Sequence, residues 1–193
     1  MNCPPKIVMP LVALILAAAS APVFAENILV ETARRINAER RKHKLRPVKY
    51  NTKLAVAAQS QAKWMAGEGK MLHLRGKQTS TFAEWKKSNH HPVNRVINGG
   101  YLKWEKLFVL TNKGGKQVLV AKPRANEHVG EIIAHGNPKS GPGRFRPRVI
   151  VTGWMNSPGH RKTILTAGFQ EIGAGFARTK RGDAFWCVVF GKR

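Results

Sequence analysis

The sequence is poor in cysteine. Its 193 residues include two, Cys3 and Cys187, and Cys3 lies in a leader segment described below. With one cysteine left in the mature chain, an intramolecular disulfide is excluded. Secretion without disulfides is more typical of a bacterial export route than of a eukaryotic one. Cys187 lies in the apolar stretch AFWCVVF, so we expect a buried core residue instead of a reactive thiol.

Acidic residues are also scarce. The sequence contains ten Asp and Glu residues and 34 Lys and Arg residues, which gives a formal net charge of +24. Such a surface attracts polyanions, whether nucleic acid, anionic lipid headgroups of a membrane surface, lipopolysaccharide or acidic cell-wall polymers. The basic patches RRINAERRKHKLR, KWEKLFVLTNKGGKQ, RFRPR and RTKRG do not form an ordered stacking platform for single strands. They predict non-specific, salt-sensitive binding to a polyanion, or simply solvated faces.

The chain has no apolar run long enough to span a membrane with ease. Residues 7–16 are apolar except at Pro10, whereas a span needs about 20 residues. Lys6 precedes this run, and residues 23–25, VFA, fit a small-x-small cleavage site. Residues 1–25 are therefore predicted to be a signal peptide cleaved after Ala25, although an uncleaved anchor helix is the alternative. We expect residues 26–193 to form one domain that is secreted, periplasmic or held at the cell envelope.

Hydrophobic periodicity predicts two helices in the first third of the mature chain. The first runs from about residue 26 to 44 and the second begins after a cap at Asn51 or Thr52. The second helix carries a continuous apolar stripe: Leu54, Ala57, Ala58, Gln61, Ala62 and Met65. Residues 74–104 are expected to be irregular, with a short helix near residues 82–87.

The remaining chain predicts hairpins and short helices. KLFVL and QVLVAK flank TNKGGK, which is typical of a β-hairpin. RVIVTGWM can form a helix or a strand, and HRKTIL a short helix. EIGAGFART and AFWCVVFG are clearly predicted to be strands, and KRGD joins them. We interpret RGD as part of the turn between these strands. This order predicts an α+β protein of packed layers. Core packing is expected for Trp154, Phe169 and Trp186.

The stretch WMNSPGH, residues 154–160, indicates a chemical site. Ser157 suits a helix N-cap and Pro158 the first helical position, so His160 occupies the third. The positive end of the helix disfavours a charged imidazole there. A neutral imidazole is what a metal ligand or a general base needs.

These segments resemble the CAP superfamily of cysteine-rich secretory, antigen 5 and pathogenesis-related proteins, in particular its bacterial SCP-domain branch. WMNSPGHRKTILTAGFQEIGAGFA and the closing FWCVVFG are similar to its strongest signature. Residues 36–66 resemble the family's first two helices and the strand between them. MLH, ending at His73, resembles the motif of the first cavity histidine. VGEIIAHG, residues 129–136, resembles the segment whose glutamate faces the same cavity.

The resemblance implies a three-layer α-β-α sandwich with a shallow cleft. Its corners would be His73, Glu131 and His160, a set that can hold zinc or another divalent metal with an open position for water. In eukaryotic relatives a second acid is common where this chain has Ser157 or Asn156, which we expect to line the cleft. Without a carboxylate pair, a two-carboxylate hydrolase is disfavoured.

Two further departures from the family are visible. Ile132 replaces the asparagine that usually follows the glutamate. The 57 residues between His73 and Glu131 exceed the spacing expected for the family. Residues 107–128 are therefore predicted to be an inserted basic hairpin near the cleft.

Three functions remain open at this point. The first is a non-catalytic binding module with a metal or small ligand in the cleft and anionic polymers or membranes on the basic surface. The second is a metal-assisted peptidase or nuclease in which Glu131 or His160 activates water. The third is nucleic-acid binding through charge alone. CxxC, HExxH, GxSxG and a phosphate loop after a strand are all missing. We favour the binding module over an enzyme.

Overall fold

The computed structural model describes residues 23–76, 84, 88–121, 128–137, 139 and 146–193. Its helices are α1 (Val23–Lys42), α2 (Thr52–Glu68), α4 (Pro92–Asn98), the 3-10 helix η1 (Trp104–Lys106), α5 (Pro147–Asn156) and α6 (Pro158–Ile164). Its strands are β1 (Lys49–Tyr50), β2 (Phe108–Lys113), β3 (Lys116–Ala121), β4 (Val129–Gly136), β5 (Glu171–Arg178) and β6 (Ala184–Gly191). The predicted α+β class is confirmed.

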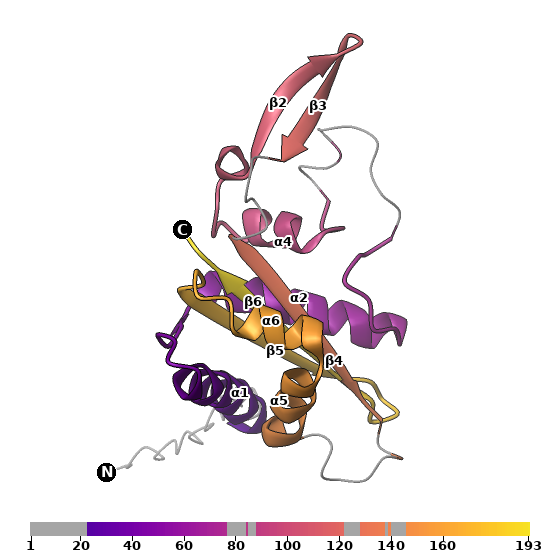
Figure 1. Ribbon diagram of the computed structural model, residues 1–193. Coiled ribbons are helices and arrows are strands. Elements are labelled where there is room, and N and C mark those ends of the chain that lie inside the picture. The colour runs from indigo at the N-terminus through magenta and orange to yellow at the C-terminus, as the bar shows by residue number, and fades with distance from the viewer. Residues whose placement is uncertain (1–22, 77–83, 85–87, 122–127, 138, 140–145) are drawn as a thin grey trace, which may run out of the picture.

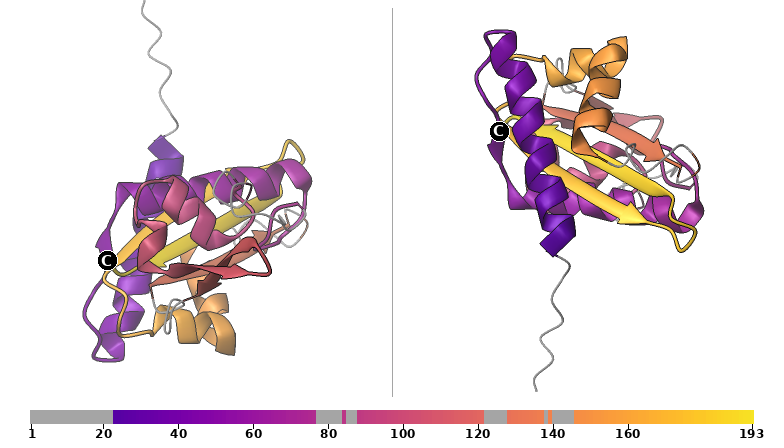
Figure 2. Two further views of the ribbon diagram at one scale, coloured as in Figure 1. Left: turned by 90° about the horizontal axis from the view of Figure 1, so that it is seen from above. Right: turned by 90° about the horizontal axis from the view of Figure 1, so that it is seen from below.

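Four strands form the central sheet in the order β1-β5-β6-β4. β1 runs parallel to β5, and the β5-β6 and β6-β4 pairs are antiparallel. Helices α1, α5 and α6 lie on one face, and α2 and α4 lie on the other (Figures 1 and 2). Because β4 is an edge strand, its outer side is available to form a cleft with the helices that follow it.

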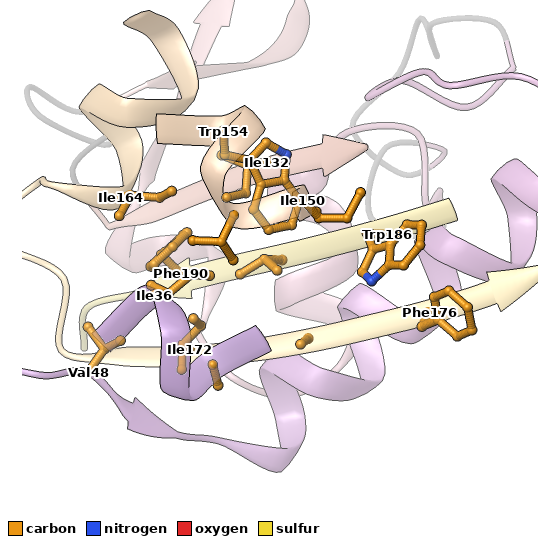
Figure 3. Close-up of a cluster of buried hydrophobic side chains, with 14 of the residues drawn as sticks. Ile36, Val48, Ile132, Ile150, Trp154, Ile164, Ile172, Phe176, Trp186 and Phe190 are labelled. Carbon is orange, nitrogen blue, oxygen red and sulfur yellow. The ribbon is translucent and has the colours of Figure 1, made fainter. Parts of the chain in front are cut away.

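Successive side chains of a strand point to opposite faces of the sheet, and the core is therefore divided into two layers. On β6, Trp186, Val188 and Phe190 pack toward α1, α5 and α6, as Figure 3 shows for the labelled side chains. Phe185, Cys187 and Val189 pack in the second cluster, with residues of α2 and α4. Every residue of β6 is buried. Its continuous apolar sequence therefore reflects a strand covered on both faces.

Helix α2 lies directly on β5. Asn51 caps the helix, since its side chain accepts hydrogen bonds from the amides of Lys53 and Leu54. All six residues of the predicted stripe are buried. A Cβ added at Gly175 would lie 2.3 Å from the carbonyl carbon of Ala58. Glycine on β5 thus allows the helix backbone to approach the sheet closely.

The structure corrects one expectation about local structure and decides between two alternatives that the sequence left open. Residues 74–104 were expected to be irregular, but α4 forms within them because Pro92 occupies the first helical turn and His91 caps it. Residues 148–155, ambiguous in sequence, belong to helix α5. The short helix expected at residues 82–87 falls outside the described residues except for Glu84.

The predicted hairpin between residues 107 and 128 is present as the antiparallel pair β2-β3. It stands away from the central sheet (Figure 1). Whether it is an insertion relative to the family stays a prediction, as does the signal peptide, most of which lies outside the described residues. None of the helices described here is both long and apolar enough to cross a membrane.

Candidate functional site

Glu131 lies on β4, and both of its carboxylate oxygens are engaged. His73 Nδ1 is 2.9 Å from Oε1, and the Arg95 guanidinium donates to Oε2 at 2.7 Å. The side chains of Glu131 and Arg95 are each only 2% exposed. Because an ionised carboxylate can only accept, His73 must carry its proton on Nδ1 and presents Nε2 outward. His73 itself is 45% exposed on its side chain.

Arg95 is a residue of this site that the sequence did not reveal. It comes from α4 and donates further hydrogen bonds to the carbonyls of Asn89, His90 and His73. It therefore ties the segment carrying His73 to the sheet through Glu131. The available signal was an arginine in PVNRVIN, an otherwise uncharged stretch, where a charged side chain needs a partner if it is buried.

The environment keeps Glu131 ionised. Burial favours the neutral carboxyl, but the His73 hydrogen bond and the Arg95 charge outweigh it and lower the pKa of Glu131. Cys187 lies beside it, with Sγ 3.4 Å from Oε2. Burial, followed by the charge of Glu131, raises the pKa of this thiol well above its usual value. Cys187 is fully buried, so the predicted core role is confirmed.

The segment that presents His73 is fixed from α2. Gln61, fully buried, donates to the carbonyl of Leu72 at 2.6 Å and accepts from Arg75 Nε at 2.7 Å. Sequence reasoning placed Gln61 in the buried stripe but gave it no role. A buried amide needs hydrogen-bond partners, and this one finds them in two residues on either side of His73.

His160 occupies the third position of α6, as the sequence predicted. Ser157 is in the N-cap position, although its side chain makes no capping hydrogen bond. Burial, and then the charge of His73, lower the pKa of His160. The neutral imidazole is therefore favoured, which agrees with the sequence argument. The charge of His73 therefore acts on His160. Of these two histidines, only His73 forms a hydrogen bond with Glu131.

A cleft of about 460 Å³ runs along β4 beneath α5 and α6. Trp154 forms part of its wall and is held by a hydrogen bond from Nε1 to the carbonyl of Ile133 at 2.9 Å. Ser157 and His160 line the cleft, while Asn156 is an exposed residue at the end of α5. The other lining residues are mostly apolar or glycine: Met71, Ile133, Ala134, His135, Gly136, Val149, Ile150 and Gly153.

The described residues do not assemble a metal centre in this arrangement. No group of three or more His, Cys, Asp or Glu side chains among them could hold a metal ion. Glu131 orients His73 in the manner of a carboxylate behind a metal-binding histidine, and Arg95 occupies its other oxygen. His73 and His160 alone would leave a zinc site short of the usual three protein ligands. Zinc binding by His73, Glu131 and His160 stays a prediction.

The remaining histidines have structural partners. His90 contacts the carbonyl of Arg75, and His91 caps α4. His135 stacks on Phe185 at 4.7 Å and lies 3.2 Å from Asp183. His128 lies 3.1 Å from the carbonyl of Lys192.

Comparison with known proteins bears on the family and the fold of the chain. The model of the cysteine-rich secretory protein family, CAP, matches residues 33–190. A 48-residue segment is 40% identical to the uncharacterized protein YkwD of Bacillus subtilis, covering 25% of this chain and 18% of that protein. The match therefore spans less than a fifth of that relative.

Two solved structures share the fold. An outer surface protein from Borrelia burgdorferi superposes with a TM-score of 0.54 at 20% identity, over 83% of this chain and 89% of that one. An extracellular SCP-domain protein from Bacillus anthracis gives a TM-score of 0.59 at 18% identity, over 88% of this chain and 41% of that one. The match to the family model covers most of the sequence, and the chain therefore belongs to the CAP, or cysteine-rich secretory protein, family.

Proposed function

We propose that this protein is a non-catalytic binding module that acts outside the cytoplasm and holds a small, largely apolar ligand in the cleft beside β4. The observation that carries this proposal is the burial of Glu131 and the pairing of its carboxylate. Its carboxylate is buried, and both oxygens are occupied by Arg95 and His73. A general base must reach the proton it removes, whereas the Glu131 side chain is only 2% exposed and both of its oxygens already accept hydrogen bonds.

The cleft itself suits recognition. Ligand sites in proteins are typically apolar hollows with a few polar groups that fix orientation. Here the polar groups are His135, which lies 3.2 Å from Asp183, and Ser157 and His160, whose side chains make no hydrogen bond with the described part of the chain. The ligand class that fits is an apolar body with one hydrogen-bonding head group. The neutral state favoured for His160 allows it to donate or to accept.

Action outside the cytoplasm is supported by two independent indications. The leader at residues 1–25 has the pattern of a signal peptide. The two structural relatives are described as an outer surface protein and an extracellular protein.

The binding test uses an uncharged probe, 1-decanol, so that the basic surface does not attract it. Gly153 lines the cleft, and a Cβ added there would meet nothing within 4 Å. Gly153→Leu should therefore fill the cleft without disturbing the core. Its matched control is Thr152→Leu, at the exposed neighbouring position of α5.

Amide NMR spectra would follow the titration. We expect saturable shifts at cleft residues in the wild type and in Thr152→Leu, and their loss in Gly153→Leu. Equal binding by both variants, or no saturable shift in the wild type, would refute a cleft ligand of this class.

The competing functions have their own readouts. Calorimetry with zinc should show no binding that depends on His73→Ala plus His160→Ala; a loss in that double variant would establish the metal site. A peptidase or nuclease would turn over peptide, nucleic-acid or cell-wall substrates with added zinc or magnesium, and would lose this activity in His160→Ala. We expect no turnover.

A further inference from the structure

A second hollow, of about 680 Å³, lies at the other end of the central sheet. The cleft faces the end of β4 at Gly136, which pairs with Ala184 at the start of β6. The second hollow lies instead where β6 ends and β5 begins, since Gly191 pairs with Glu171. It is therefore a separate site from the cleft.

Backbone hydrogen bonds join the three segments that line this hollow. The amide of Lys49 donates to the carbonyl of Gln170 at 2.9 Å, and the amide of Gln170 donates to the carbonyl of Gly191 at 3.0 Å. Side chains before β1, before β5 and after β6 are thereby brought to one place. The stem of Lys192 crosses the middle segment, because a Cβ at Gly168 would lie 4.0 Å from Lys192 Cδ.

The charges around the hollow are unbalanced. Arg46, Lys49 and Lys192 line it, and no ion pair or side-chain hydrogen bond joins any of them to the described residues. Glu171 is the one acidic residue of the lining. Its carboxylate is already satisfied by Arg193 and by hydrogen bonds from Tyr101 and Asn51 at 2.6 and 2.8 Å.

A buried cation lies beneath the same segments. Arg40 is fully buried and donates to the carbonyls of Arg46, Thr166 and Phe169 at 3.0, 3.0 and 3.3 Å, and to that of Ile164 at 2.7 Å. These partners are all neutral carbonyls, and none is a carboxylate. Arg40 thus fixes the loops that form the hollow and adds a positive charge that has no carboxylate partner among the described residues.

We propose that this hollow is a binding site for a phosphate-bearing anion. Arg46 offers a planar fork of donors and the two lysines offer point charges. Charge-assisted hydrogen bonds of this kind suit a phosphate group, which carries several acceptor oxygens. The hollow also has room for a small group attached to the phosphate. The site is independent of the cleft proposed above, so that either can fail without the other.

The test compares two triple variants with the same change in net charge. Arg46→Gln, Lys49→Gln and Lys192→Gln remove the three free cations of the hollow. Lys63→Gln, Lys70→Gln and Lys180→Gln remove three exposed lysines that do not line it. Pyrophosphate is titrated at physiological salt by calorimetry, and amide NMR locates its binding.

We expect saturable binding with shifts at Gly168 and neighbouring amides. The hollow variant should lose about tenfold or more in affinity because its charge-assisted hydrogen bonds are gone, whereas the matched variant should change little. Equal losses in the two variants would mean general charge attraction and would overturn the site. The absence of saturable binding in the wild type would overturn it as well.

Two further ligands separate the sources of the phosphate. If the physiological group is a lipid headgroup, vesicles containing phosphatidic acid should bind the wild type and the matched variant but not the hollow variant. If it is a soluble phosphomonoester, glycerol 3-phosphate should show the same difference between variants, and vesicle binding should fall equally in both.

Discussion

Glu131 and Arg95 form an ion pair that is almost completely removed from solvent, with an N–O separation of 2.7 Å. Resemblance to the family identified the glutamate as a cavity corner, and by itself this suggested a metal ligand or a base. The arginine changes that interpretation. An acid whose charge is neutralised by a buried guanidinium serves to hold structure, here the position of His73.

Replacing Arg95 tests this structural role. Arg95→Met leaves Glu131 as an unpaired buried charge, which typically costs about 3–5 kcal/mol. The double variant Arg95→Met with Glu131→Gln removes both charges and should recover a large part of that loss. Urea unfolding at neutral pH, where Glu131 is ionised, measures both.

Either of two unfolding results would contradict a stabilising ion pair between Arg95 and Glu131. If Arg95→Met unfolds with the wild-type midpoint, or if the double variant is no more stable than the single one, Glu131 is not held by Arg95. A free carboxylate would then return as a candidate base or metal ligand.

At the scale of the elements, the packing of α2 on β5 depends on glycine. Gly173 and Gly175 alternate along the strand and both face the helix, where an added Cβ would come within 2.1 and 2.3 Å of its backbone. The neighbouring residues Ile172, Ala174 and Phe176 face the opposite layer. The strand therefore presents a smooth surface to one helix layer and apolar side chains to the other.

Gly175→Ala should destabilise the protein. The new methyl group meets backbone atoms of α2, which cannot rotate away, so overpacking of about 1–3 kcal/mol or more is expected. Gly67→Ala is the control, because its Cβ would meet nothing within 4 Å and alanine favours the helix by up to about 1 kcal/mol.

Urea unfolding of the two alanine variants measures both effects. We expect the free energy of unfolding to fall in Gly175→Ala and to rise in Gly67→Ala. Equal stability of Gly175→Ala and the wild type would mean that α2 does not lie on β5 as described.

Helices and strands whose apolar residues repeat at a regular spacing were predicted well from the sequence. The stripe of α2 and the strands of the last hairpin follow from the spacing of apolar residues alone. Helix α4 was missed because seven residues with Arg95 inside carry little periodic signal. The short apolar run at residues 129–136 suits a helix or a strand by periodicity alone, and pairing with β6 makes it strand β4.

For the molecule as a whole, the composition is strongly basic, with 34 Lys and Arg and only ten Asp and Glu. The formal charge is +24, and removal of the predicted leader with Lys6 leaves +23. Most of these side chains are not neutralised by acids, since the sequence contains only ten. We expect charge of this size to attract polyanions before a specific contact is made.

Duplex DNA binding should therefore depend steeply on salt. The logarithm of the affinity should fall by roughly 0.9 for each phosphate contacted per tenfold increase in salt. Filter binding across a salt series measures this slope. We expect Gly153→Leu and His160→Ala to leave it unchanged; a slope near zero, or one that depends on the cleft, would argue against attraction through charge alone.

Local sequence patterns were sufficient to predict the α+β class, the two N-terminal helices, the buried stripe, the closing strands and the position of His160 at the start of a helix. These follow from periodicity and capping, which act over a few residues. The tertiary structure decided that Glu131 is held by Arg95, that Gln61 fixes the segment before and after His73, and that Arg40 lies beneath a basic hollow. Each of these pairs joins residues from different segments, and such partners become neighbours only when the chain folds.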